Sequence, residues 1–217
     1  MELARSVAAV GFRGIYVDAN AVAPATTRRV GEIVAAGGAS FVDGGIIGPP
    51  PAEPGRTRLY LSGPRAGEVA SLFADAALSA TVVEGGSGAA SALKMCFAAW
   101  NKGSQLLLAS VRALAEREGV HAALAEECRL SQPEVAKRLE NAVANARKGW
   151  RWVGEMDEIA ATFRAAGLPD GFAVAGAEVC RRLEAFKDAP GATIDQVVDA
   201  LLGDGAPGVR RAASPRA

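Results

Sequence analysis

The chain has 217 residues, 50% of them hydrophobic, so it is long enough to bury the core of one generous domain or of two small ones. Its 24 basic and 24 acidic residues balance, which argues against nucleic acid or an anionic membrane as a partner. No apolar run is long enough to cross a membrane, and the first residues lack the pattern of a secretory signal. We therefore expect a cytoplasmic globular protein.

Up to about residue 85, short β-type runs alternate with helical ones. The four predicted strands lie in GIYVDAN, ASFVDGG, TRLYLSG and SATVVEG, and the two predicted helices between them lie in PATTRRVGEIVAAGG and PRAGEVASLFADA. This alternation is typical of an α/β layer, and we expect a partial Rossmann-type domain over residues 1–85.

After residue 86 the sequence predicts helices only. A long helix over about 88–118 is expected to join the sheet to a helical domain over 86–202, and the final stretch, residues 203–217, has the composition of a disordered tail. Two capping boxes predict helix starts, one with Ser131 and Glu134 and the other with Thr193 and Gln196. In a later helix, Phe172, Ala175, Val179, Leu183 and Phe186 share one face and are expected to pack.

The cysteines and the single histidine do not form a metal-binding pattern. Cys96, Cys128 and Cys180 are odd in number and far apart, as in a protein from a reducing compartment. His121 has no second histidine or cysteine pair near it, so we expect no metal site.

The stretch GGSGAASALKM places a glycine turn directly before the long helix. It is close to a G-x-G-x-x-G fingerprint, but residues 104–150 offer only helix, so a self-contained Rossmann unit is rejected here. The glycines and serines would allow close backbone approach, and a helix start with free N–H groups suits a carboxylate or a phosphate.

Lys94 lies on a polar stripe of this helix. At 100° per residue, one side of the helix carries Ser87, Ser91, Lys94, Asn101 and Gln105, with Lys102 near its edge. The opposite side is apolar enough to be buried and carries Leu93, Cys96, Phe97, Trp100, Leu107 and Leu108. Because the polar stripe contains no acids, it predicts a cleft wall rather than a solvated helix face.

The order of motifs resembles the β-hydroxyacid dehydrogenase superfamily, which includes 3-hydroxyisobutyrate and 6-phosphogluconate dehydrogenases. The resemblance is closest to a branch of NAD(P)-dependent oxidoreductases with a phosphogluconate-dehydrogenase-like C-terminal domain. The segments that carry it are Asp18-Ala19-Asn20-Ala21-Val22-Ala23-Pro24, Gly88 through Lys94, Lys102-Gly103 and VGEMDEIAATFRAAGLP. It covers residues 15 to about 200.

The resemblance implies an oxidation of the CH–OH group of a small hydroxy acid with NAD or NADP. Lys94 corresponds to the general base and acid, and a lysine in a cleft suits this role. The resemblance further implies that Asn20, Ser91, Asn101 and Lys102 bind the substrate, that Asn20 and Gly88 contact the cofactor, and that the chain forms a homodimer.

Three departures separate this chain from the superfamily. Ala98 stands where an asparagine is usual, four residues after the lysine, and Ala21 stands where the substrate loop usually has a hydroxyl. Nothing before GIYVD supplies the N-terminal G-x-G-x-x-G unit, so we expect the C-terminal part of a longer, truncated enzyme with an incomplete cofactor site. The alternative is a non-catalytic helical dimerisation or binding domain that has lost the dinucleotide site.

Overall fold

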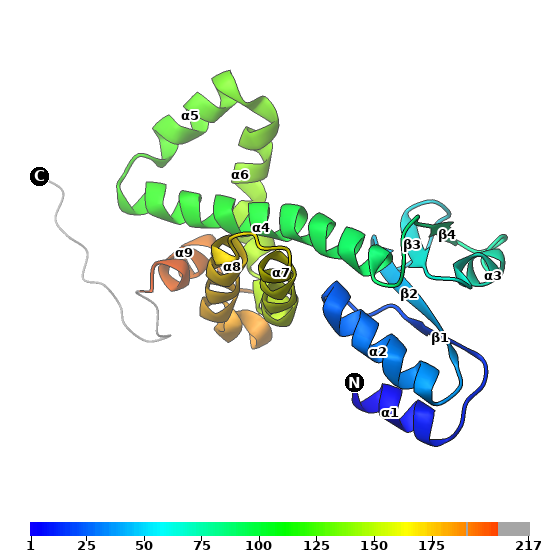
Figure 1. Ribbon diagram of the computed structural model, residues 1–217. Coiled ribbons are helices and arrows are strands. Elements are labelled where there is room, and N and C mark those ends of the chain that lie inside the picture. The colour runs from blue at the N-terminus through cyan, green and yellow to red at the C-terminus, as the bar shows by residue number, and fades with distance from the viewer. Residues whose placement is uncertain (190, 204–217) are drawn as a thin grey trace, which may run out of the picture. The chain divides into compact units, whose positions relative to one another are not determined.

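The described part of the protein consists of two compact units. The structure is a computed structural model that describes residues 1–189 and 191–203. The first unit is Met1–Trp100 with Asp157–Gly171, and the second is Asn101–Met156 with the chain from Phe172 onward. An α/β part is followed by helices, as predicted (Figure 1). The expected tail lies outside the described residues from 204 on, and the boundary at residues 85 and 86 stays a prediction.

The first unit contains all four predicted strands. Its elements up to the long helix are α1 (Glu2–Ala9), β1 (Ile15–Asp18), α2 (Pro24–Ala36), β2 (Ser40–Ile47), β3 (Thr57–Ser62), α3 (Ala66–Ser71) and β4 (Leu78–Val82). The strands form one sheet in the order β1-β2-β3-β4. Helix α1 precedes the first predicted strand and is an addition to the expected elements.

The sheet is mixed rather than wholly parallel. Strands β1 and β2 are parallel, as are β3 and β4, and each of these pairs is connected through a helix. Strands β2 and β3 are antiparallel because residues 48–56 between them are too few for a helical crossover. Two strand-helix-strand units are therefore joined by a hairpin-like loop.

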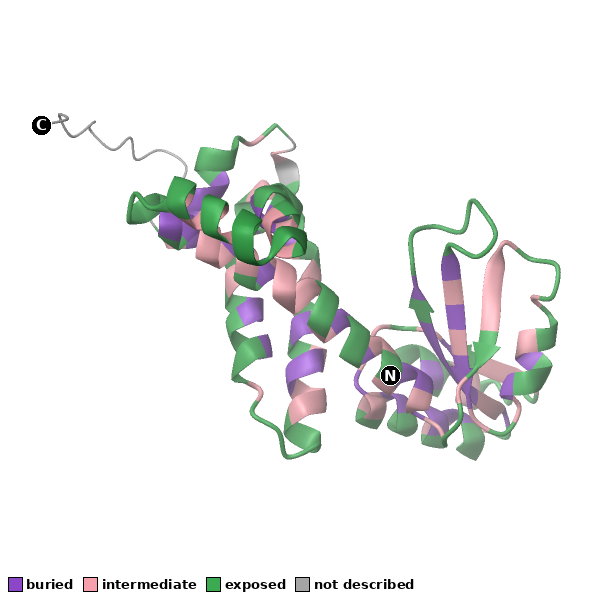
Figure 2. Cartoon of the chain, turned by 90° about the horizontal axis from the view of Figure 1, so that it is seen from above, coloured by how far each residue is buried: buried purple, intermediate pink, exposed green. Residues whose placement is uncertain are grey.

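Side chains alternate across this sheet, so each face packs against its own helices. One face, around Val42 and Leu61, packs against α3, and the other, around Tyr16 and Phe41, packs against α1 and α2. Most of β2 and β3 is buried, whereas β4 is half-buried or exposed (Figure 2).

The second unit is helical throughout its described residues. The helix α4 (Ala89–Arg117) begins in the first unit, close to the predicted start at residue 88, and continues into the second. The later elements are α5 (His121–Ser131), α6 (Pro133–Ala146), η1 (Gly149–Trp152), α7 (Val153–Ala165), α8 (Gly171–Arg182), η2 (Glu184–Asp188) and α9 (Ile194–Leu202). Among the described residues, no helix combines the length and the apolar character needed to span a membrane.

The core of the second unit relies on small side chains. The buried cluster there consists of Ala109, Ala113, Ala142, Val143, Ala146, Leu183, Val197, Val198 and Leu201. The predicted packing face of α8 is wrong in part, because Phe172 is 83% exposed and Ala175 is also exposed. Instead α8 buries small residues, and a Cβ at Gly176 would lie 2.5 Å from Met156 Cε. Close approach between helices thus decides which side of α8 is buried.

One of the two predicted capping boxes is present. Thr193 caps α9 and exchanges hydrogen bonds with Gln196, as predicted. The box at Ser131 and Glu134 is wrong: Ser131 ends α5 and donates to the Glu127 carbonyl oxygen, and Gln132 is the N-cap of α6. The reason is Pro133, which is accommodated at the first helical position and so moves the cap to the residue before it.

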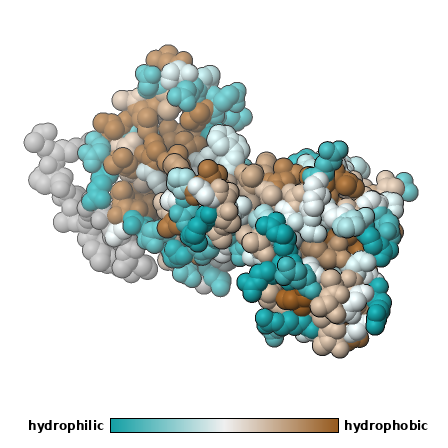
Figure 3. All heavy atoms as spheres, viewed as in Figure 1, coloured by the Kyte–Doolittle hydropathy of each residue, from teal (hydrophilic) through white to brown (hydrophobic). Residues whose placement is uncertain are grey.

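The side of α4 predicted to be buried is largely exposed, although Leu108 is partly buried and packs against the core of the second unit. Its large apolar side chains range from 36% exposure at Leu93 to 66% at Trp100, with Phe97, Leu107 and Leu114 between these values. We call these five residues the outer face of α4. The buried side carries Met95, Ala98, Leu106, Ala109 and Ala113 instead. Helix α5 has no buried residue, and apolar side chains are visible at the surface where α5 and α6 lie (Figure 3).

Candidate functional site

The start of α4 is organised around the buried carboxylate of Asp43 on β2. Asp43 Oδ2 accepts hydrogen bonds from Ser62 Oγ at 2.9 Å, from the Gly88 amide at 3.1 Å and from the Ser91 amide at 3.0 Å. Asp43 Oδ1 accepts from Ser91 Oγ at 2.6 Å. Asp43 is fully buried, and its negative charge lies at the positive end of the helix dipole.

This arrangement uses the N–H groups that a ligand would need. The amides of Gly88 and Ser91 donate to Asp43, the Ala90 amide donates to Ser62 Oγ, and the Ala89 amide donates to the Gly86 carbonyl oxygen. The expectation of free N–H groups for an external anion is therefore not met. What Gly88 provides is a turn with φ of 102°, a conformation that favours glycine.

Ser91 is an internal part of this network. Its side chain is 1% exposed, and its Oγ lies 2.8 Å from Thr27 Oγ1 on α2 in addition to its bond to Asp43. In this arrangement the hydroxyl connects α4 to β2 and α2, so its visible role is to fix the start of the helix.

Lys94 lies one turn further along α4, at the surface of β2. A Cβ added at Gly45 would lie 2.9 Å from the Ala90 carbonyl oxygen and 3.2 Å from Lys94 Cβ, so the glycine lets helix and strand approach closely. Lys94 is partly exposed, and its Nζ donates to the Ile46 carbonyl oxygen at 2.8 Å. The β1 pairing stops at Asp43, so Ile46 lies in the part of β2 without a β1 partner.

Asn20 lies on the loop after β1. Its backbone amide and its Nδ2 both donate to Asp18 Oδ1, at 3.0 and 2.5 Å, and Asp18 is the in-register neighbour of Asp43. Burial, followed by the Asp18 charge, raises the pKa of the Tyr16 phenol above its usual value. Asp18 thus holds both the backbone and the side-chain Nδ2 of Asn20, and the residue is exposed, so its amide oxygen can contact a ligand.

Asn101 and Lys102 belong to the second unit. Asn101 is exposed. Lys102 forms an ion pair with Glu155 Oε2 and lies over the Trp152 ring, with 5.6 Å between Nζ and the ring centroid. Glu155 Oε1 is buried and has no hydrogen-bond partner among the described residues. Lys102 is thus held by the Oε2 atom of Glu155 on α7, while the Oε1 atom of the same carboxylate accepts no hydrogen bond among the described residues.

Several site features escaped the sequence analysis. The sequence places Asp43 only in the predicted strand segment ASFVDGG, and Glu155 and Glu158 only in the segment VGEMDEIAATFRAAGLP. Their partners lie far away in sequence, so no local pattern predicts these contacts. Ala98, at the position where the superfamily has asparagine, is 2% exposed and faces the core. Three or more His, Cys, Asp or Glu side chains that could hold a metal ion do not come together anywhere in the described residues.

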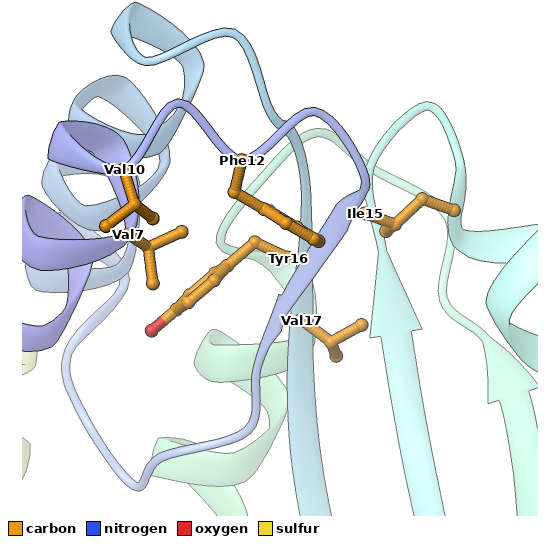
Figure 4. A pocket seen from close by; sticks show the side chains of 6 residues that line it. All are labelled: Val7, Val10, Phe12, Ile15, Tyr16 and Val17. Carbon is orange, nitrogen blue, oxygen red and sulfur yellow. The ribbon is translucent and has the colours of Figure 1, made fainter.

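A second feature of the first unit is an open apolar hollow beside β1, with a volume of about 280 Å³. Its lining residues are Val7, Val10, Phe12, Ile15, Tyr16 and Val17 (Figure 4). Its lining contains no charged side chain, so it is poorly suited to a hydroxy acid.

The comparisons with known proteins agree with this fold. Residues 115–183 match the model of a domain of unknown function, DUF1932, which is found in the C-terminal part of 3-hydroxyacid dehydrogenase-like proteins. The comparison with curated proteins gives no match. The fold and this domain match are similar to those of 3-hydroxyacid dehydrogenase-like proteins.

Particular solved structures support the same class. A conserved hypothetical protein from Sinorhizobium meliloti 1021 is 25% identical with a TM-score of 0.75, over 94% of this chain and 72% of that chain. The conserved protein MTH1747, described as structurally similar to 3-hydroxyacid dehydrogenases, is 26% identical with a TM-score of 0.64, over 88% and 74%.

A third structure shares the fold alone. The Mycobacterium tuberculosis 3-hydroxyisobutyrate dehydrogenase with L-serine is 15% identical with a TM-score of 0.61, over 86% of this chain and 69% of that chain. The domain match and the MTH1747 structure together confirm the superfamily predicted from the motifs.

Proposed function

We propose that the chain is an NAD(P)-dependent oxidoreductase, or the C-terminal part of one, that acts on the CH–OH group of a small hydroxy acid. The observation that carries the proposal is the placement of Lys94. Its ammonium donates to the Ile46 carbonyl oxygen, next to a helix start that four hydrogen bonds to Asp43 and Ser62 fix in place. A catalytic acid or base needs such a fixed backbone to reach its substrate reproducibly.

In the proposed reaction Lys94 moves a proton. With its amine neutral, Nζ accepts the proton of the substrate hydroxyl as the carbon–oxygen bond becomes a carbonyl, and in the reverse direction the ammonium returns it. Positioned acid–base catalysis of this kind contributes about 10²- to 10⁴-fold in rate. The Ile46 carbonyl oxygen accepts one hydrogen bond from Nζ, which holds the end of the Lys94 side chain at this position.

The cofactor supplies the acceptor of hydride in this class of reaction. The glycine turn before α4 does not fit a pyrophosphate, because Asp43 and Ser62 already use its amides. Gly88 therefore contributes the shape of the backbone before α4, and its amide is already bonded to Asp43. Of the residues assigned to the cofactor from the sequence, exposed Asn20 is the better contact.

For the substrate, we propose contacts from Asn20, Asn101 and Lys102, with Ser91 acting indirectly. Asn20 and Asn101 are exposed and offer amide groups for hydroxyl and carboxylate oxygens. Lys102 forms an ion pair with Glu155, and we propose that its ammonium also attracts a substrate carboxylate. Ser91 is buried against Asp43 and Thr27, so it supports the position of Lys94 instead.

We further propose a homodimer that covers the outer face of α4. Leu93, Trp100, Leu107 and Leu114 recur every seven residues, and small residues, Cys96, Gly103 and Ser110, follow the first three of them at a distance of three. A seven-residue repeat with large and small positions fits a second copy of the same helix. An 11-residue α5 without any buried residue also suggests that part of its packing comes from a partner.

The test of the activity is a turnover assay on the chain joined at its N-terminus to a G-x-G-x-x-G nucleotide-binding unit. The substrates are small hydroxy acids with either NAD or NADP, and the absorbance of the reduced cofactor is followed. We expect turnover that falls by at least about 100-fold in Lys94→Ala. The matched control is Lys137→Ala, since Lys137 is an exposed lysine on α6. Equal turnover in Lys94→Ala and Lys137→Ala contradicts the proposal.

The second candidate function is a non-catalytic dimerisation or binding domain. Two observations favour it. The backbone amides at the start of α4 already donate to a side chain of the protein, and the outer face of α4 exposes large apolar side chains. It predicts a dimer that shows neither turnover nor any change in thermal midpoint with NAD or NADP, whereas a ligand that binds the folded protein raises the midpoint.

A further inference from the structure

Helix α2 begins without a cap of its own. Its N-cap is Ala23, which has no side chain that can accept a hydrogen bond, and its first turn contains no acidic residue. Pro24 follows at the first helical position, where its fixed φ favours a helix start. The local sequence nevertheless supplies no side chain that caps the first amides.

The missing acceptor comes from α7. Glu158 Oε2 accepts a hydrogen bond from the Ala23 amide at 2.6 Å and one from Thr26 Oγ1 at 3.3 Å. In a capping box, a Glu at the third helical position accepts from the N-cap amide. Here Thr26 occupies that third position, and a glutamate 135 residues away from Ala23 performs the role. Both segments belong to the first unit.

The two hydrogen bonds fix one end of the loop between β1 and α2. At its other end, Asn20 is bound to Asp18 through its backbone amide and its Nδ2. The loop is therefore anchored on both sides of Asn20, once by its own strand and once by a residue from the C-terminal half of the chain.

We propose that Glu158 is a positioning residue that holds this loop so that Asn20 presents its side chain to the substrate. The role of Asn20 rests on the proposed function, whereas the hold on the loop does not. The carboxylate acts at the positive end of α2 and bonds two donors at once, which makes it a stronger anchor than a neutral acceptor. Removal of the carboxylate should therefore free the loop while the sheet stays intact.

The first measurement is hydrogen exchange of residues 19–26 in the full chain. In Glu158→Ala, we expect the Ala23 amide to exchange at least about tenfold faster, because a hydrogen bond to a charged group is lost. Glu158→Gln keeps an acceptor and should show a smaller increase. The control is Glu32→Ala, an exposed acid on α2 itself, which should leave exchange unchanged. Unchanged exchange in Glu158→Ala overturns the proposal, and the milder Gln variant answers the question if Ala prevents folding.

The second measurement asks whether Glu158 acts through Asn20. In the turnover assay, Glu158→Ala should raise KM more than it lowers kcat, and the double variant with Asn20→Ala should be no worse than Asn20→Ala alone. Additive losses overturn the route through Asn20. If the chain joined at its N-terminus to a G-x-G-x-x-G nucleotide-binding unit shows no turnover, the proposed function fails, while hydrogen exchange in the chain itself still decides whether Glu158 holds the loop.

Discussion

The start of α4 and its outer face differ in whether their side chains find partners within the chain. At the start, the carboxylate of Asp43 receives four hydrogen bonds within the chain, and the neighbouring amides are satisfied as well. Along the outer face, Trp100 and Leu107 are 66% and 63% exposed, although the opposite side of the same helix is closely packed. One region is complete within a single chain, and the other leaves large apolar side chains in water.

This difference separates what one chain must build from what a second copy can supply. A buried carboxylate requires its donors in the same fold, because an unpaired buried charge costs several kcal/mol. An apolar surface can remain uncovered until a partner arrives, since burial is non-directional and depends on area. We therefore read the start of α4 as the fixed centre of the site and the outer face as the place of assembly.

The largest effect is expected from Asp43→Ala. The substitution leaves four buried donor bonds unmade, and we expect the free energy of unfolding to fall by about 3–5 kcal/mol. Denaturant unfolding measures it. Asp75→Ala, at an exposed position, is the control and should change stability by less than about 0.5 kcal/mol. A loss of similar size in both variants would mean that the Asp43 network adds little.

The next effect concerns the outer face of α4. Leu107→Glu places a charge in the proposed interface, and we expect dimer affinity to fall by at least about 100-fold, because desolvating an unpaired carboxylate is costly. Light scattering over a dilution series measures the change. Leu72→Glu is the matched control, since Leu72 is 78% exposed and lies outside α4. A dimer that persists in Leu107→Glu, or a monomeric unaltered chain, contradicts this interface.

A smaller effect is expected at the pair of Lys102 and Glu155. Lys102→Met leaves a largely buried carboxylate without its partner, and we expect a loss of about 1–3 kcal/mol in unfolding free energy. Adding Glu155→Gln to this variant should recover part of the loss, because the unpaired charge is then removed. A double variant that is as unstable as the sum of both single variants would show that the two side chains do not act as a pair.

The smallest effect compares the two predicted capping boxes. Thr193→Ala should cost about 1 kcal/mol, because the box that caps α9 is lost. Ser131→Ala should change stability by less than about 0.5 kcal/mol, since Ser131 is an exposed residue in the last turn of α5. Thermal unfolding of both variants measures the contrast, and an equal loss in the two would contradict the assigned helix starts.

Local patterns in the sequence were enough to predict the four strands and the long helix, but not α1. The four strands and the long helix through Lys94 follow from periodicity and glycine placement, which act over a few residues. The buried sides of α4 and α8 could not be predicted in the same way. Hydrophobicity favoured Trp100 and Phe172, but helices approach closest where side chains are small, as at Ala109 and Gly176.

The candidate site was predictable only where its residues are neighbours in sequence. Gly88, Ser91 and Lys94 share the first turns of one helix, so their proximity could be predicted. The bonds of Asp43 span 45 and 48 residues and the bond of Glu158 to Ala23 spans 135, so no local pattern connects those partners. A buried acid before two glycines was the available signal for Asp43, and its meaning depended on the fold.

The measurement that tests the central claim most directly is the pair of kcat and thermal midpoint for Lys94→Ala in the turnover assay. We predict that kcat falls by about 10²- to 10⁴-fold while the thermal midpoint stays close to that of Lys137→Ala, because Lys94 moves a proton and is not part of the core. A Lys94→Ala chain that turns over as fast as the unaltered protein would contradict the assignment of Lys94 as the acid–base group.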